Sequence, residues 1–125
     1  MSDVKVAPGC NRVMPYLILK DGLGFIEFAK NILDAKEDAI YYTDDQKLMH
    51  AQITIGDSMI MIGEASDKWP VNNAGMFIYV ADADKTYKEA LAAGAKSIME
   101  PVNQDYGRSG GVTDAWGNVW WITSL

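Results

Sequence analysis

Four polar residues have the side chains and the spacing to act on a small molecule. His50 and Gln52 alternate with apolar residues in a strand predicted from residue 47 to 55. Histidine can exchange a proton near neutral pH, and a glutamine amide both donates and accepts hydrogen bonds. Arg108 falls on the corresponding face of a later strand, with Tyr106 near the rim, and its forked N–H donors could hold a carboxylate or a phosphate. Together they predict a polar wall beside a ligand.

Each of these residues also has a purely structural interpretation. A lone histidine on a strand can have a purely structural role, in which it hydrogen-bonds its neighbours. Arg108 can form an ion pair with the nearby Asp105. General acid–base catalysis would have to depend on His50 or on a carboxylate, with no strong partner visible in the sequence. The chain carries no nucleophile elbow, no paired-cysteine motif and no phosphate-binding glycine-rich loop that opens a helix. We therefore assign no catalytic residue.

Composition excludes several classes of function. The 125 residues are enough for one domain, and the net charge of -6 with 11 scattered Lys and Arg argues against nucleic acid as a partner. No run of eighteen apolar residues and no signal-peptide pattern is present, so we expect no membrane association. Cys10 is the single cysteine and cannot form an internal disulfide, which fits a cytoplasmic protein.

The elements that must position these residues occur twice, about sixty residues apart. Residues 17–36 and 78–96 each contain a short apolar run, an Asp, an amphipathic stretch and Ala-Lys, and residues 55–62 align with 115–122. Two copies of one supersecondary unit must share a core, because neither can bury its apolar face alone. We expect one domain with module one at about 12–63, a linker at 64–74 and module two at about 75–125.

Each module is predicted to have the order βαβββ. Asp21 and Asp82 are placed to cap the two helices. The apolar stripe of the first helix includes Phe25 and Phe28, and that of the second includes Tyr87. The predicted strands are 12–20, 37–43, 47–55, 58–62, 76–80, 97–100, 108–113 and 118–123. The fold class is therefore α+β.

This order of elements comes with a recognisable set of short motifs. They are Pro15-Tyr16-Leu17 to Asp21, Phe25-Ile26-Glu27-Phe28, Met49-His50-Ala51, Ile55-Gly56-Asp57-Ser58, Ala92-Ala93-Gly94-Ala95, Tyr106-Gly107-Arg108 and the closing segment Asp114 to Trp120. On these motifs the sequence resembles the vicinal oxygen chelate superfamily, which includes glyoxalase I, the bleomycin-resistance proteins and the extradiol dioxygenases. It departs from the usual closing motif at Ala115 and Asn118, which replace a Pro and a His.

The resemblance implies a cupped, eight-stranded mixed sheet with a helix of each module on its outer face. Ligands bind in the hollow of this cup, and many members are homodimers. Metal-using members hold a divalent ion with four side chains, and counting from the motifs places those positions at Met14, Met61, Met76 and Trp121. Thioethers are poor ligands for such ions, and an indole is no ligand at all. We therefore expect neither a metal nor another cofactor.

The same four residues could be ordinary core fillers or the apolar floor of a pocket. If they line a pocket, strand alternation adds Tyr16 and Met59 to it, and flexible thioethers around an indole would suit a flat ligand. The main hypothesis is therefore a protein that binds a small, partly aromatic molecule in an apolar cup without a metal. Its predicted ligand-binding residues are Met14, Tyr16, His50, Gln52, Met59, Met61, Met76, Tyr106, Arg108 and Trp121.

Two other functions stay open. The chain could be a lyase, isomerase or dioxygenase of the same superfamily, using a relocated metal or none, with His50 and Arg108 as its active groups. It could also be a degenerate domain that is purely structural or binds a partner protein.

Overall fold

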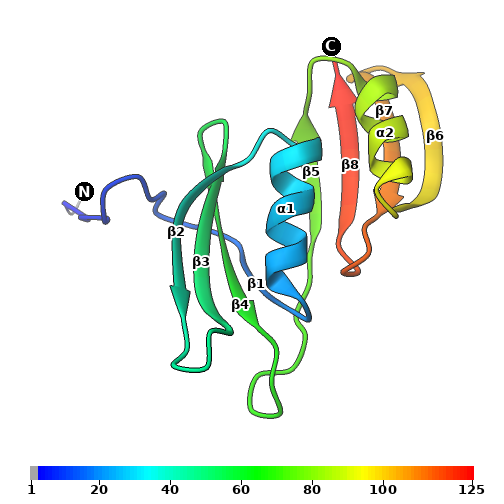
Figure 1. The fold of residues 1–125 in the computed structure, drawn as a ribbon. Helices are drawn as coiled ribbons and strands as arrows, with labels where there is room; N and C mark the ends of the chain where they lie inside the picture. Colours follow the sequence, from blue (N-terminus) through cyan, green and yellow to red (C-terminus); the bar gives the residue numbers. More distant parts are fainter. Residues whose placement is uncertain (1–2) are drawn as a thin grey trace.

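The computed structural model describes residues 3–125, which form two modules of the predicted order βαβββ (Figure 1). Module one consists of β1 (Tyr16–Leu19), α1 (Gly22–Ile32), β2 (Lys36–Tyr42), β3 (Leu48–Ile55) and β4 (Ser58–Glu64). Module two consists of β5 (Gly75–Tyr79), α2 (Ala83–Ala92), β6 (Lys96–Gln104), β7 (Gly107–Thr113) and β8 (Val119–Ser124). The eight strands and two helices confirm the predicted α+β class.

Each module forms its own four-stranded mixed sheet. The strand orders are β1-β4-β3-β2 and β5-β8-β7-β6. In both sheets the first and last strands of the module pair in parallel, and the remaining pairs are antiparallel. The two sheets lie side by side, with both helices on the same side of the molecule (Figure 1). Each sheet therefore has one face toward the helices and one open face.

Carboxylates fix the start of both helices. The side chain of Asp21 accepts a hydrogen bond from the amide three residues further on, and that of Asp82 does the same for Lys85. Glu64, at the end of β4, also accepts bonds from the amides of Asp21 and Gly22, at 2.8 and 2.9 Å. These bonds satisfy amides that have no partner within the helix. Glu64 thereby ties the first turn of α1 to its own sheet.

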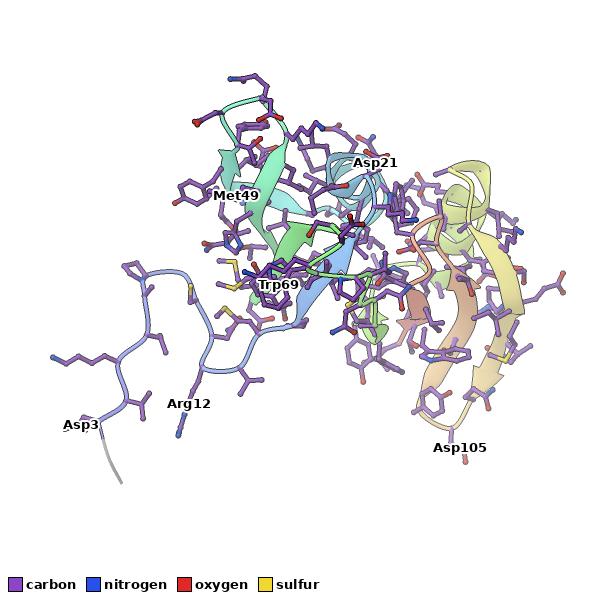
Figure 2. The ribbon with its side chains drawn as sticks, turned by 90° about the horizontal axis from the view of Figure 1, so that it is seen from below. Asp3, Arg12, Asp21, Met49, Trp69 and Asp105 are labelled. Carbon is purple, nitrogen blue, oxygen red and sulfur yellow. The ribbon has the colours of Figure 1, made fainter. Side chains whose placement is uncertain are left out.

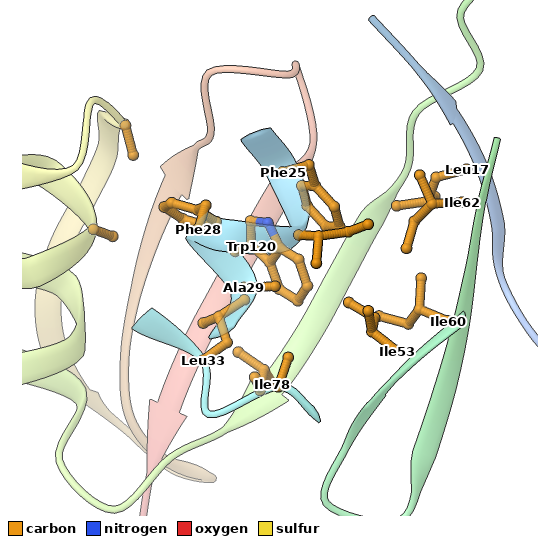
Figure 3. Packing of buried hydrophobic residues seen from close by; sticks show 14 of the residues in the cluster. Leu17, Phe25, Phe28, Ala29, Leu33, Ile53, Ile60, Ile62, Ile78 and Trp120 are labelled. Atoms are coloured by element: carbon orange, nitrogen blue, oxygen red, sulfur yellow. The ribbon is translucent and has the colours of Figure 1, made fainter. Parts of the chain in front are cut away.

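Helix α1 packs against both modules. The ring of Phe25 is fully buried, with its centroid 5.7 Å from that of Trp116 and 6.5 Å from that of Trp120. Leu17, Ile60 and Ile62 of module one belong to the same cluster of buried side chains (Figure 3). The repeat predicted a shared core, and α1 is the element through which the modules share it.

Strand β1 begins at Tyr16, four residues later than predicted. The preceding segment does not form a ladder with β4 but is held by Asn11, whose side chain accepts a bond from the amide of Met59 at 2.9 Å and donates one to the carbonyl of Asp57 at 3.3 Å. Apolar residues at 13 and 14 extended the predicted strand, but no ladder forms there, although the register of Tyr16 with Met61 would set residue 13 opposite Ser58 at the start of β4. Within residues 3–125, no helix is long and apolar enough to cross a membrane.

Candidate functional site

The open face of module one carries a short chain of polar side chains. Leu17, Ile53 and Ile62 are buried on the helix side, so the residues that alternate with them lie on the open face. These are Tyr16 and Ile18 of β1, His50 and Gln52 of β3, and Met59 and Met61 of β4. His50 and Gln52 therefore lie on the face where their alternation placed them.

Hydrogen bonds link these polar residues into a chain that runs from Tyr16 through His50 to Gln52. The Tyr16 hydroxyl lies 3.1 Å from Nδ1 of His50, and Nε2 of His50 lies 3.4 Å from Oε1 of Gln52. The Gln52 amide nitrogen donates to the sulfurs of Met59 and Cys10, at 3.7 and 4.0 Å. Because Oε1 of Gln52 can only accept, Nε2 of a neutral His50 carries the proton and Nδ1 accepts from Tyr16. The hydroxyl oxygen of Tyr16 is then available as an acceptor for a ligand.

Aromatic rings hold His50 in place. Its ring centroid lies 5.5 Å from that of Tyr16 and 6.1 Å from that of Tyr41, which is its partner across β2 and β3. Both tyrosines are about half exposed. Nearby, Met59 is only 3% exposed because the segment around Gly9 and Asn11 crosses over it. The open face of module one is therefore partly covered by residues 9–11 of the same chain.

The open face of module two is aromatic. Phe77 and Tyr79 of β5, Tyr106 of the β6–β7 turn and Trp121 of β8 form a group that we call the aromatic cluster. Their exposed fractions are 49, 65, 52 and 37%, respectively. The Phe77 ring meets Tyr79 edge to face, with centroids 5.2 Å apart, and Tyr106 at 6.2 Å. Beneath the cluster, Ser109 and Thr123 form a buried hydrogen bond of 2.8 Å.

Gly111 lets the indole of Trp121 lie down on the sheet. The two residues are partners across β7 and β8. A Cβ added to Gly111 would stand 2.4 Å from Cζ3 and 2.7 Å from Cε3 of the indole, which no real side chain permits. One side of the ring system therefore rests on backbone, and 37% of the residue remains exposed. Trp121 is a flat apolar platform in the middle of module two.

Arg108 lies on the helix side of its sheet, so the prediction that it shares the open face with His50 was wrong. Its Nε and Nη2 donate to the two carboxylate oxygens of Asp84 in α2, at 2.6 and 3.0 Å, and Nη1 donates to Asn103 at 3.1 Å. The hydrogen bond from Arg108 holds the pKa of the Asp84 carboxyl below its ordinary value, and the same bond raises the pKa of Arg108. The alternative interpretation as an ion pair holds, with Asp84 as the partner in place of Asp105.

Met76 also lies on the helix side, where it pairs with the buried Trp120. Its neighbour Phe77 occupies the open position, opposite Trp121. Met14 precedes β1 and is half-buried. The sequence count missed Phe77 and Tyr79, although the burial of Ile78 between them follows from simple alternation in a strand.

The sequence count placed the four positions of the implied metal site at Met14, Met61, Met76 and Trp121. The open-face residues at or near these positions on the paired first and last strands are Tyr16, Met61, Phe77 and Trp121. Tyr16 pairs with Met61 across β1 and β4, and Phe77 pairs with Trp121 across β5 and β8. A phenol, a thioether, a phenyl ring and an indole do not fit an ion that prefers imidazole and carboxylate. In the described part of the chain, no three His, Cys, Asp or Glu side chains come together in a way that could hold a metal ion.

A wide cleft runs along the free edge of β5, between the two modules. Its volume is about 1260 Å³. One wall comes from the end of α1 and the β3–β4 turn of module one, and the other from β5, the start of α2 and Trp120. Among the predicted ligand-binding residues, Met59 and Met76 line this cleft. It borders the aromatic cluster, because Phe77 and Tyr79 also line it.

Residues 15–122 match the sequence profile of the Glyoxalase/Bleomycin resistance protein/Dioxygenase superfamily. Among curated proteins, the chain is 28% identical over 118 residues to the uncharacterised protein Mb0911c of Mycobacterium bovis, covering 85% of this chain and 78% of that one. The same identity and the same share of this chain apply to the uncharacterised protein Rv0887c of Mycobacterium tuberculosis, 69% of which is covered.

Solved structures share the fold at low sequence identity. TioX from Micromonospora sp. ML1 superposes with a TM-score of 0.74 at 16% identity, over 91% of this chain and 98% of TioX. TnmS3, an antibiotic-binding protein from Streptomyces sp. CB03234, gives a TM-score of 0.68 at 16% identity, over 89% of this chain and 92% of TnmS3. At these identities the likeness concerns the fold alone.

Proposed function

The chain belongs to the Glyoxalase/Bleomycin resistance protein/Dioxygenase superfamily, and we propose that it binds a small, partly aromatic molecule on the open faces of its sheets without a metal. One observation supports this most. Tyr16, Met61, Phe77 and Trp121, on the open faces of the first and last strands of the modules, carry rings and a thioether where the resemblance implies metal ligands. Binding pockets for small molecules are mostly apolar, with a few polar groups that fix orientation. The aromatic cluster would supply the apolar surface, and Tyr16 with His50 the polar group.

The antibiotic-binding neighbour TnmS3 lends this proposal support by analogy of fold. The test is a titration of purified protein with a panel of flat aromatic compounds, followed by tryptophan fluorescence and by the thermal unfolding midpoint. We expect quenching and stabilisation by part of the panel, and loss of both in Trp121→Leu. Absence of any quenching or stabilisation across the panel would refute the proposal.

A second function is an enzyme in which His50 acts as acid or base. The hydrogen-bonded chain from Tyr16 through His50 to Gln52 favours it, because such a chain fixes which imidazole nitrogen accepts a proton. Arg108 has no part in this version, since Asp84 engages it on the other side of the sheet. Metal analysis of the purified protein separates the metal-free binding protein from the version of the enzyme that uses a relocated metal. A stoichiometric transition metal whose removal lowers stability would overturn the metal-free proposal.

We also propose that the protein is a homodimer. One chain leaves Tyr41, Phe77, Tyr79 and Tyr106 about half or more exposed on its open faces, and exposed groups of apolar side chains often mark a protein interface. A second copy facing these sheets would close them into a cup. Sedimentation equilibrium gives the mass directly, and a monomer at micromolar concentration would contradict this part of the proposal.

The cytoplasm is the compartment that we propose. Cys10 is a free, half-buried cysteine whose sulfur accepts a weak bond from Gln52. A reducing compartment would preserve that thiol. Fractionation of cells that express the tagged protein tests this, and recovery in an extracellular or membrane fraction would contradict it.

A further inference from the structure

We propose that the preferred ligand carries a delocalised positive charge, an inference that rests on the proposed ligand binding and adds a charge class to it. The aromatic cluster carries this inference. Its four residues are 37 to 65% exposed in the single chain, so in the proposed dimer their rings would face the cup that the second copy closes. The faces of aromatic rings carry partial negative charge, and a cation within about 6 Å of a ring centroid is attracted to it.

The rings of the cluster are arranged around Phe77. Tyr79 meets it at an interplanar angle of 75°, Tyr106 at 52°, and Trp121 is its partner across β5 and β8. Rings at such different angles present faces to more than one side of a bound group. Trp121 adds a platform that is held flat by Gly111, and indole is the strongest of the aromatic rings in attracting cations. A planar cation could lie on the indole with its edge against the phenol rings.

Formal charges around the cluster favour a cation as well. The four strands of module two contain only two basic residues, Lys96 and Arg108. Arg108 is engaged by Asp84 on the helix side. Lys96 is the first residue of β6 and pairs with Thr113, whereas Tyr106 follows the other end of that strand. On the strands that carry the cluster, an anion would thus meet ring faces and few positive charges. Lys85 of α2 is the basic residue that lines the same cleft as Phe77 and Tyr79.

A carboxylate lies at the side of the cluster instead. Asp105 occupies the tip of the β6–β7 turn next to Tyr106, on the side of the molecule away from both helices (Figure 2). The chain as a whole has a net charge of -6. Stacking alone would bind neutral and charged rings equally well. The negative charge of the chain therefore predicts a preference for a cationic ring that stacking alone does not predict.

Three probes with one ring system test the preference: N-methylacridinium, acridine and acridine-9-carboxylate at pH 8. They differ in charge and share the same planar frame. We expect N-methylacridinium to bind about tenfold more tightly than acridine, and the carboxylate to bind most weakly, as measured by calorimetry. Equal affinity for all three, or tightest binding of the carboxylate, would overturn the charge preference and leave the proposed ligand binding intact. Absence of binding by all three would instead count against the proposed function.

Variants locate the effect. Tyr79→Leu and Trp121→Leu should each bring the ratio of the two affinities, N-methylacridinium to acridine, close to one. Tyr42→Leu is the matched control, because Tyr42 is 48% exposed but pairs with Leu48, which is buried beside α1 on the helix side. This control should keep the tenfold ratio. If the cluster variants also keep it, the cation is attracted by the acidic chain in general and the inference is wrong.

Discussion

Gly111 is the residue on which the platform of module two depends. An alanine there would place its Cβ against the indole of Trp121, which would have to rise from the sheet or push the strand away. Overpacking of this kind costs about 1–3 kcal/mol. We therefore expect Gly111→Ala to lower the free energy of unfolding by about that amount and to weaken binding of a flat ligand, as measured by urea denaturation and calorimetry.

Gly75→Ala is the matched control for that substitution. Gly75 also lies in module two, at the start of β5, and a Cβ added to it would meet no atom within 4 Å. Its free energy of unfolding should change by about 0.5 kcal/mol at most. Equal effects of the two substitutions would mean that the indole does not rest on Gly111.

The ion pair of Arg108 with Asp84 predicts a dependence of stability on pH. Because Arg108 lowers the pKa of Asp84 in the folded protein, the folded state binds the Asp84 proton less readily than the unfolded state does. The stabilisation is therefore present above the unfolded pKa of an aspartate, about 3.9, and is lost as pH falls through the lower folded value. Urea denaturation between pH 5 and 2 should show a shallower acid loss of stability in Arg108→Gln than in the wild type.

Ligand affinity gives the second measurement on Arg108→Gln. The side chain lies on the helix side of the sheet, away from the proposed ligand site. Affinity for flat aromatic compounds should therefore stay within about twofold of the wild type, because substitutions at distant sites act almost independently of each other. Asp84→Asn should reproduce the pH effect of Arg108→Gln, because it removes the other partner of the same ion pair. A large loss of ligand affinity in Arg108→Gln would restore Arg108 to the ligand site.

At this scale, side-chain orientation could be predicted only where the strand alternates strictly. His50 and Gln52 do so, and they lie on the expected face. Arg108 was placed by the sixty-residue repeat, but the sheet registers make Ser109 the counterpart of His50, since Ser109 pairs with Thr123 as His50 pairs with Gly63. An offset of one residue reverses the face of a strand. Whether the predicted residues bind a ligand stays a prediction.

The β7–β8 turn is the element that fixes Trp120 and Trp121 in register. Asp114 is 4% exposed, and its carboxylate accepts bonds from the amides of Trp116 and Asn118, from the Asn118 side chain and from the Trp120 indole. Removing a carboxylate that satisfies several buried donors costs more than one ordinary hydrogen bond. We expect Asp114→Ala to lower the free energy of unfolding by about 3 kcal/mol in urea denaturation.

Asp105→Ala is the control for the substitution in the β7–β8 turn. Asp105 lies in the β6–β7 turn of the same module and is exposed. It should change stability by about 0.5 kcal/mol at most. If Asp114→Ala were equally mild, the buried donors would have found other partners and the turn would not depend on the carboxylate.

The type and order of the elements could be predicted because capping residues and periodicity act locally. Asp21 and Asp82 mark the helix starts, and the apolar stripes of both helices point to a core. The start of β1 could not, because the residues before Tyr16 are held by bonds of Asn11 to Asp57 and Met59, which are distant in the sequence. The parity of β5 was missed for a related reason: Met76, Phe77 and Ile78 are all apolar, so the side that each faces is decided by the packing of Trp120 and not by polarity.

For the whole molecule, the position of α1 is the feature that the repeat could not reveal. An internal repeat implies that two modules share a core, but it treats them as equal. In the structure, α1 also contacts Trp116 and Trp120 of module two through Phe25. The asymmetry arises because Trp116 and Trp120 align with Gly56 and Ile60 of module one, which carry no aromatic ring.

The position of Phe25 therefore predicts that the two modules unfold together. It is fully buried between sheets of both modules, and truncation of a buried phenylalanine costs about 3–5 kcal/mol. Phe25→Ala should lower the free energy of unfolding by that amount, and it should affect both modules at once because the ring belongs to their common core.

Far-ultraviolet circular dichroism, which reports on both modules, and tryptophan fluorescence, dominated by Trp116, Trp120 and Trp121 of module two, should give coincident denaturation curves in the wild type. Leu23→Ala, at an exposed position of the same helix, should cost about 0.5 kcal/mol or less. Two separate transitions in the wild-type protein would mean that each module carries its own core and that Phe25 does not join them.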